Sequence, residues 1–161
     1  MRDPFREGLA AGWKHVDASQ LAVDLPIEAD VVIVGSGAGG GVSAELLTAA
    51  GLKVVIVEEG PLRTSSDFNM REAEAYPDLY QESAARKTAD KAINILQGRC
   101  VGGSTTVNWT SSFRTPPRTL QWWQSAWGLK RLGVDAMAPW FAAMEQRLHV
   151  GLWPIPPNEN N

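Results

Sequence analysis

The sequence predicts an α/β fold that contains a parallel βαβ unit, and three features of residues 29–60 carry this prediction. An apolar, largely β-branched run at 30–34 indicates a buried strand. A glycine-rich turn follows at once, and residues 39–50 then place an apolar stripe at helical spacing. A second apolar run at 53–57 indicates another strand. In this order the elements are typical of a Rossmann-like dinucleotide-binding unit.

The glycines of the turn have separate expected roles. Gly35 permits the tight turn out of the strand, Gly37 lets the backbone approach a pyrophosphate, and Gly40 lets the helix pack close to the strand. The N-terminus of the helix adds N–H groups that are free to bind phosphate, and Gly51 is expected just beyond its C-terminus. The predicted phosphate-binding residues are Gly35, Ser36, Gly37, Ala38, Gly39 and Gly40.

Two acidic residues, Glu58 and Glu59, follow the second apolar run. An acid at this place, about 20 residues past the glycines, accepts hydrogen bonds from a ribose hydroxyl. We assign this role to Glu58, which comes first, and expect Glu59 to face solvent. A carboxylate here would repel a 2′-phosphate, so NADP is disfavoured, but the βαβ unit alone does not distinguish NAD from FAD.

A second glycine motif, GRCVGGSTTVN at 98–108, makes this distinction. It resembles the signature of the glucose–methanol–choline (GMC) oxidoreductase family. The segments 29–40 and 58–61 also resemble the start of that family, and the resemblance runs to about residue 116. It implies that the βαβ unit belongs to an incomplete FAD-binding domain. The residues of the second motif that it places near the diphosphate and flavin are Gly98, Arg99, Gly102, Gly103, Ser104 and Asn108.

The resemblance also implies an activity, the oxidation of the CH–OH group of an alcohol with hydride transfer to the flavin N5. Oxygen, a quinone and a cytochrome all remain open as electron acceptors. The family's catalytic His lies near its far C-terminus, so we expect no catalytic residue within 1–161 and an inactive fragment. FAD is expected to be non-covalent, because His15 and His149, the only histidines, lie outside the second motif. The alternatives are a non-catalytic nucleotide-binding fragment and an NAD-dependent Rossmann enzyme.

The expected organisation is an N-terminal extension at 1–28, a partial FAD-binding domain at 29–153 and a Pro/Asn-rich linker at 154–161. Because family members are several hundred residues longer, we expect the chain to be a piece of a longer protein. The net charge of −3 argues against nucleic acid as a partner. No signal peptide, membrane span or metal-ligand pattern is found, so a cytoplasmic location is expected.

The single cysteine, Cys100, lies inside the second motif. A redox thiol beside a flavin and a small buried side chain are both possible roles, and we favour the buried side chain. Further helices are expected at 5–13, 72–86 (interrupted at Pro77), 120–127 and 136–148, with 61–70 as a loop and 89–96 as helix or strand. The three tryptophans of 120–127 are expected to pack rather than to stack on a ligand.

Overall fold

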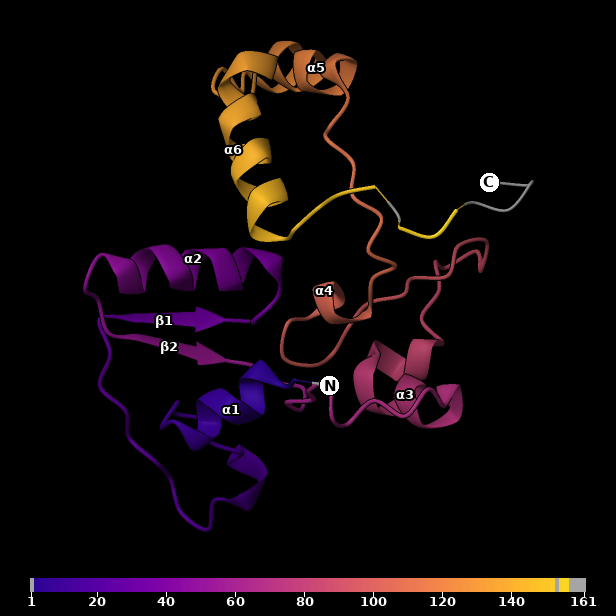
Figure 1. Ribbon diagram of the computed structural model, residues 1–161. Helices are drawn as coiled ribbons and strands as arrows, with labels where there is room; N and C mark the ends of the chain where they lie inside the picture. The colour runs from indigo at the N-terminus through magenta and orange to yellow at the C-terminus, as the bar shows by residue number, and fades with distance from the viewer. Residues whose placement is uncertain (1, 153, 157–161) are drawn as a thin grey trace. The chain divides into compact units, whose positions relative to one another are not determined.

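The computed structural model describes residues 2–152 and 154–156, and the chain forms two compact units that divide between Trp109 and Thr110. This division falls inside the domain predicted at 29–153. Trp153 and most of the predicted linker, 157–161, lie outside the described residues. The elements labelled in Figure 1 are α1 (Pro4–Ala10), β1 (Val31–Val34), α2 (Ala38–Ala49), β2 (Val54–Val57), α3 (Glu72–Leu79), α4 (Ser104–Val107), α5 (Pro117–Trp127) and α6 (Val134–Arg147).

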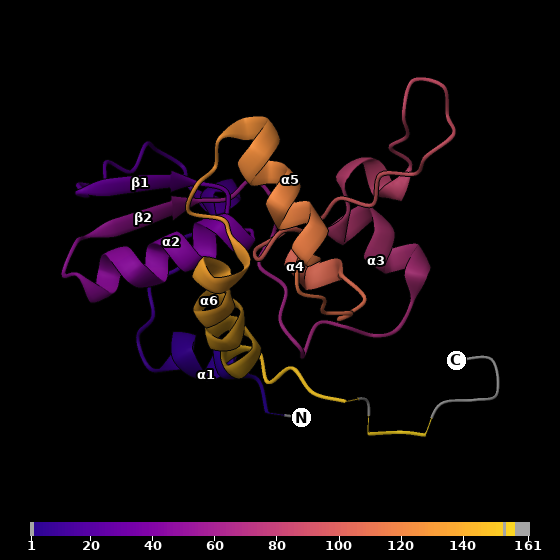
Figure 2. The same cartoon turned by 90° about the horizontal axis from the view of Figure 1, so that it is seen from above.

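The predicted βαβ unit is confirmed. β1 and β2 pair in parallel, with Val31 opposite Val54 and Val34 opposite Val57. Figure 2 shows the two strands pointing the same way with α2 running alongside them. The loop from β1 to α2 is short because Gly35, at φ +91°, turns the chain directly toward the helix. Both strands therefore end at the same edge of the sheet, where the glycine loop lies.

Helix α2 is held close to β1 by the absence of a side chain at Gly40. A Cβ atom at that position would lie 2.0 Å from the Gly35 carbonyl oxygen and 3.3 Å from a methyl group of Ile33. Gly37 is the N-cap of the helix, and Gly51 adopts φ +87° just beyond its C-cap, as predicted. The sequence thus sets both ends of this helix.

The N-terminal segment is folded onto the rest of the first unit. Asp3 caps α1 by accepting a hydrogen bond from the Arg6 backbone N–H, and Pro4 occupies the first turn. The helix ends at Ala10, three residues before the predicted end, because the chain reverses at Gly12 (φ +101°). The indole of Trp13 then packs over Gly8 and meets Phe5 edge-to-face at 6.1 Å.

The region between the two glycine motifs differs from the prediction. α3 ends at Leu79, and a short 3-10 helix at Gln81–Ala84 replaces the expected last turns. Pro77 lies inside α3 rather than interrupting it. Residues 89–96, predicted as helix or strand, form neither. They belong to a projecting turn in which Lys91 has φ +62° and the Asp90 carboxylate accepts the Ala92 N–H, and such local bonds compete with regular structure.

The second unit contains α5 and α6, joined by a turn in which Gly128 takes the left-handed conformation. Both predicted helices are therefore present, beginning two or three residues earlier than expected. In α5, Leu120 is buried, while Trp127 meets Trp122 edge-to-face at 6.1 Å. Both of these rings are more than half exposed, so the predicted packing of the tryptophans is slight within this unit.

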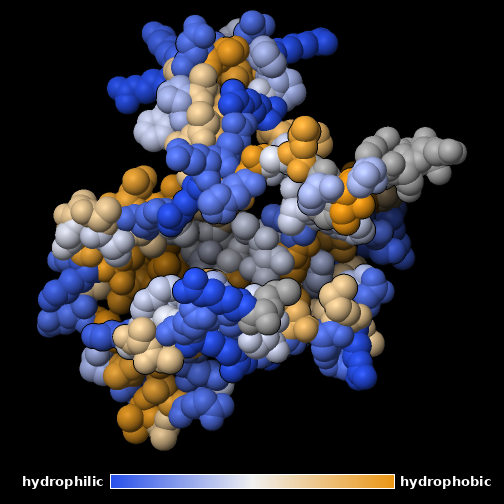
Figure 3. Space-filling view, in the orientation of Figure 1, coloured by the Kyte–Doolittle hydropathy of each residue, from blue (hydrophilic) through white to orange (hydrophobic). Residues whose placement is uncertain are grey.

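Apolar side chains are buried at few places. In the described part of the first unit, Leu79 and Cys100 are the buried apolar residues. The βαβ unit leaves much apolar surface open, with Val34 of β1 86% exposed and Leu46 of α2 63% exposed. Figure 3 shows hydrophobic atoms reaching the surface over this region. The sheet is therefore covered by α2 without being enclosed.

Candidate cofactor site

The glycine loop between β1 and α2 has the features of a phosphate-binding site. A Cβ atom added at Gly35, Gly37 or Gly39 would meet nothing within 4 Å, so the space beside the loop is open to a ligand. The N-cap Gly37 contributes no side chain to the first N–H groups of α2. The twelve-residue helix adds the positive end of its dipole, which favours an anion at this place. The loop and helix therefore fit a pyrophosphate, as the glycine spacing predicts.

Glu58 follows β2 directly and lies against the glycine loop. Its Oε2 atom accepts a hydrogen bond from the Ser36 backbone N–H at 2.9 Å and from the Ser36 hydroxyl at 2.6 Å. Its Oε1 atom accepts the Gly60 N–H at 3.1 Å. The backbone also joins the two strand ends, since the Gly35 N–H donates to the Val57 carbonyl at 2.8 Å. The carboxylate is thus held at the carboxyl edge of the sheet.

The carboxyl group of Glu58 is held in its charged form. Burial acts to raise its pKa, but hydrogen bonds from the Ser36 hydroxyl, the Ser36 N–H and the Gly60 N–H outweigh this effect. The pKa of Glu58 therefore lies below its ordinary value. At neutral pH the group is an acceptor, as a contact with ribose hydroxyls requires.

The second glycine motif lies directly against the first. The Gly102 N–H donates to the hydroxyl oxygen of Ser36 at 2.9 Å. A Cβ atom at Gly103 would come within 3.0 Å of the Gly37 Cα, so the two backbones meet where neither residue has a side chain. Gly103 also has φ +54°, which strains other residues. The structure therefore brings together two motifs that are about sixty residues apart in the chain.

Residues 60 and 61 connect the end of β2 to the second motif. A Cβ atom at Gly60 would lie 2.2 Å from the Arg99 carbonyl oxygen, and the Pro61 carbonyl accepts the Val101 N–H at 3.0 Å. Glu59 is exposed, as predicted, and forms a surface ion pair with Arg99 at 3.2 Å. Gly60 belongs to the segment 58–61 that resembles the start of the family, but it is not among the predicted cofactor-binding residues.

Within the second motif, three predicted residues build the turn itself. Ser104 accepts the Gly98 N–H at 3.0 Å through its hydroxyl and begins the short helix α4, for which Gly103 is the N-cap. A Cβ atom at Gly98 would lie 2.4 Å from the Gly103 carbonyl oxygen. Asn108 follows the end of α4 and is exposed. The contacts of Gly98, Gly103 and Ser104 are structural and hold the turn of the second motif together.

Cys100, which lies inside the second motif, is completely buried. Burial raises the pKa of its thiol above the ordinary value, so the group is protonated at neutral pH. A protonated, inaccessible thiol is a poor nucleophile, which agrees with the prediction of a small buried side chain. Among residues 2–152 and 154–156, no cluster of His, Cys, Asp and Glu is arranged to hold a metal ion.

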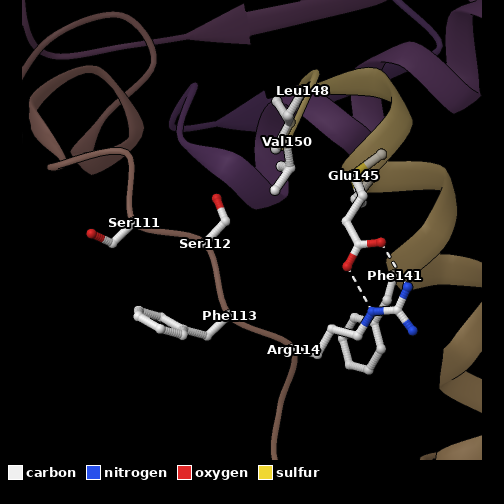
Figure 4. Close-up of a pocket in the computed structure, with 9 residues that line it drawn as sticks. Ser111, Ser112, Phe113, Arg114, Phe141, Glu145, Leu148 and Val150 are labelled. Atoms are coloured by element: carbon white, nitrogen blue, oxygen red, sulfur yellow. Dashed lines mark hydrogen bonds and ion pairs between the residues drawn. The ribbon is translucent and has the colours of Figure 1, made fainter. Parts of the chain in front are cut away.

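The second unit has a hollow of its own, of about 290 Å³, shown in Figure 4. Arg114 reaches from the extended segment before α5 to Glu145 on α6, and its two nitrogens donate to the two carboxylate oxygens at 2.6 Å each. This contact lowers the pKa of Glu145. Phe141, Leu148 and Val150 line the same hollow, so its wall is apolar apart from the ion pair and the neighbouring serines.

Two family models match this sequence. The model of an FAD binding domain matches residues 30–93, and the model named GMC oxidoreductase matches residues 76–161, which is more than half of the chain. The two matches together span both glycine motifs. No helix among the described residues is both long and apolar enough to cross a membrane.

Individual proteins agree with the family models. The long-chain-alcohol oxidase FAO4B of Arabidopsis thaliana is 42% identical over 107 residues, which are 66% of this chain and 14% of that protein. A GMC-type oxidoreductase of Mycobacterium tuberculosis is 36% identical over 166 residues, covering 96% of this chain and 26% of that protein. The crystal structure of a pyridoxine 4-oxidase from Mesorbium loti superposes with a TM-score of 0.52 at 30% identity, over 70% of this chain and 23% of the other. The chain thus spans about a seventh to a quarter of the length of these relatives.

Proposed function

Because the chain belongs to the GMC oxidoreductase family and is an FAD-binding region of it, we propose that its two glycine motifs form one FAD site. The observation that carries the proposal is the contact between them, in which Ser36 bonds both Glu58 and the Gly102 N–H. A shared site needs the phosphate loop, the ribose acid and the second motif at one place. The alternatives of a non-catalytic fragment and an NAD-dependent enzyme are not favoured by the family matches.

The residues divide into three groups by what they offer a ligand. Gly37 and the N-terminus of α2 bind the pyrophosphate through backbone N–H groups, and Gly35, whose own N–H donates to Val57, turns the chain so that these groups face the ligand. Glu58 accepts hydrogen bonds from the adenosine ribose. Gly102 and Gly103 let a flat ligand pass close to the backbone, and their own position depends on Ser36.

The complete protein is proposed to oxidise the CH–OH group of an alcohol, as the names of its long-chain-alcohol oxidase relatives indicate for those proteins. Bound FAD supplies the hydride acceptor in such a reaction. The residues of this chain bind and orient that group. His15 and His149 do not adjoin the glycine motifs in the sequence, and we propose that the base which takes the hydroxyl proton lies outside residues 1–161.

The proposal includes non-covalent attachment, because the buried thiol of Cys100 is protonated and no histidine lies in the second motif. The test uses full-length protein purified under native conditions and then precipitated with acid. We expect a yellow protein whose FAD is released into the supernatant. Anaerobic addition of a primary long-chain alcohol should then bleach the flavin absorbance of an untreated sample. A colourless protein that cannot be loaded with FAD would contradict the cofactor assignment, and flavin in the pellet would contradict non-covalent attachment.

A further inference from the structure

The N-terminal segment, expected to be an extension, makes its strongest contacts with residues far along the chain. Asp3 is 8% exposed, and its Oδ2 atom accepts the Ser66 N–H at 3.0 Å and the Ser66 hydroxyl at 2.6 Å. Its other oxygen caps α1 through the Arg6 N–H. One buried carboxylate therefore joins the first turn of α1 to a segment 63 residues away.

A second set of contacts closes the same junction. Thr64 is 5% exposed, and its N–H donates to Asp67 at 2.8 Å within a tight turn. The Arg6 guanidinium donates to the Thr64 hydroxyl at 3.2 Å and pairs with the other oxygen of Asp67. Residues 64–67 are thus held by Asp3, the N-cap of α1, and by Arg6 of α1. Together the contacts of this junction involve five side chains from two distant segments: Asp3, Arg6, Thr64, Ser66 and Asp67.

Residues 64–67 are connected to the candidate cofactor site through the residues that precede them. Towards the N-terminus, residues 64–67 are preceded by Arg63, Pro61 and Gly60. Arg63 donates a hydrogen bond to Asp78 of α3 at 2.7 Å. The Pro61 carbonyl holds the Val101 N–H, and Gly60 touches the backbone of Arg99. Segment 60–67 therefore has α1 at one end and the second glycine motif at the other.

We propose that α1 is a clamp that positions the second glycine motif, and that Asp3 is its positioning residue. Without the clamp, segment 60–67 loses its attachment at residues 64–67 and holds Val101 and Gly102 less firmly against Ser36. Asp3 touches no part of the cofactor site, so its effect passes through this segment. The link to FAD affinity rests on the proposed function, whereas the link to the order of the second motif does not.

The test compares Asp3→Asn with Asp17→Asn by amide hydrogen exchange on the full-length protein without FAD. Asp17 is a matched control, because it also caps a helix and accepts both the N–H and the hydroxyl of a serine, but the serine is the neighbouring Ser19. In Asp3→Asn we expect the amides of Ser66 and Val101 to exchange about 5- to 100-fold faster, as expected when a buried hydrogen-bonded group loses its partner. The amides of the βαβ unit should keep their rates.

Three results would overturn the clamp: unchanged exchange at Val101, an equal change in Asp17→Asn, or a uniform increase that includes β1 and β2. If Asp3→Asn fails to fold, Arg6→Gln serves as the second variant. Arg2→Gln is its control, because the side chain of Arg2 forms an ion pair with the exposed Glu7 and not with residues 64–67. Ser66→Thr keeps the hydroxyl, so the Val101 amide should still exchange slowly in this variant, whereas in Ser66→Ala it should exchange faster.

FAD titration separates the clamp from the proposed function. We expect Asp3→Asn to weaken FAD binding several-fold while Asp17→Asn does not. A wild-type protein that binds no FAD would contradict the proposed function. The hydrogen exchange of the Val101 amide would then still test the clamp on its own. Faster exchange at Val101 with unchanged FAD affinity would overturn the connection between the clamp and the cofactor site.

Discussion

The Ser36 hydroxyl donates a hydrogen bond to Glu58 Oε2 at 2.6 Å while its oxygen accepts the Gly102 N–H at 2.9 Å. One small side chain therefore connects the acid after β2 with the second glycine motif. It uses the hydroxyl as donor and acceptor at once, which no apolar residue of the same size can do. Because the Ser36 backbone N–H also donates to Glu58 Oε2 at 2.9 Å, both the side chain and the N–H of residue 36 are engaged within the protein.

Ser36→Ala should weaken FAD binding by about 5- to 100-fold, because it leaves a charged carboxylate and a backbone N–H without this partner. The measurement is a titration of apo-protein with FAD. Ser125→Ala is the control, since that hydroxyl donates only to a carbonyl of its own helix. Equal FAD affinity in the Ser36→Ala variant and the wild type would show that the hydroxyl does not connect the motifs functionally.

Glu58→Gln should weaken FAD binding by about 1–3 kcal/mol, which is the cost of losing hydrogen bonds to a charged group. The new amide would also place N–H groups against the N–H groups of Ser36 or Gly60. Glu59→Gln should change the affinity little, because that carboxylate forms only an exposed ion pair with Arg99. The same titration measures both variants. A larger loss in Glu59→Gln would move the ribose contact to Glu59.

Gly40→Ala and Gly39→Ala form a matched pair at adjacent positions of α2. The added methyl group at Gly40 would lie 2.0 Å from the Gly35 carbonyl oxygen, whereas at Gly39 it would meet nothing within 4 Å. We expect Gly40→Ala to lower the free energy of unfolding by about 1–3 kcal/mol, as overpacked sites do. Gly39→Ala should cause no loss, because alanine favours a helix. Chemical unfolding without FAD measures both, and equal effects would contradict the close approach of α2 to β1.

The stability difference between wild type and Asp3→Asn should depend on pH. Hydrogen bonds from the Ser66 hydroxyl and from the N–H groups of Arg6 and Ser66 hold the pKa of Asp3 well below its ordinary value. A carboxylate with a lowered pKa contributes stability above its unfolded pKa and loses it as the pH falls. Asp67, which also has a lowered pKa, titrates in both proteins. The difference in unfolding midpoint between the wild type and Asp3→Asn should thus be constant above about pH 5 and become smaller below about pH 4. A gap that widens on acidification would contradict this.

Residues 1–161 expressed alone should associate or form a loose state and should not reduce a dye acceptor with alcohol, even with FAD added. Apolar side chains such as Val34, Trp127 and Trp140 are each more than 60% exposed, and large exposed apolar surfaces favour association. Size-exclusion chromatography and a dye-reduction assay measure the two properties. A monomer with a sharp unfolding transition would contradict the first expectation, and alcohol turnover would contradict the second.

The sequence by itself determined the βαβ unit and the candidate cofactor residues. The strand, glycine turn, helix and second strand are local, since each depends on the periodicity and backbone freedom of a few consecutive residues. Gly35 turns the chain and Gly51 follows the helix as the pattern predicts. Local patterns failed at 89–96, where a polar turn with Lys91 at positive φ replaces a regular element.

Only the tertiary structure decided which distant groups meet. Ser36 and Gly102 are 66 residues apart, and Asp3 and Ser66 are 63 residues apart. A serine in a glycine-rich loop and an aspartate before a proline have good local uses, as a turn residue and a helix cap, so their sequence context points no further. Their partners are set by the parallel pairing of β1 with β2 and by the path of residues 60–67, along which segments far apart in the chain come within hydrogen-bonding distance.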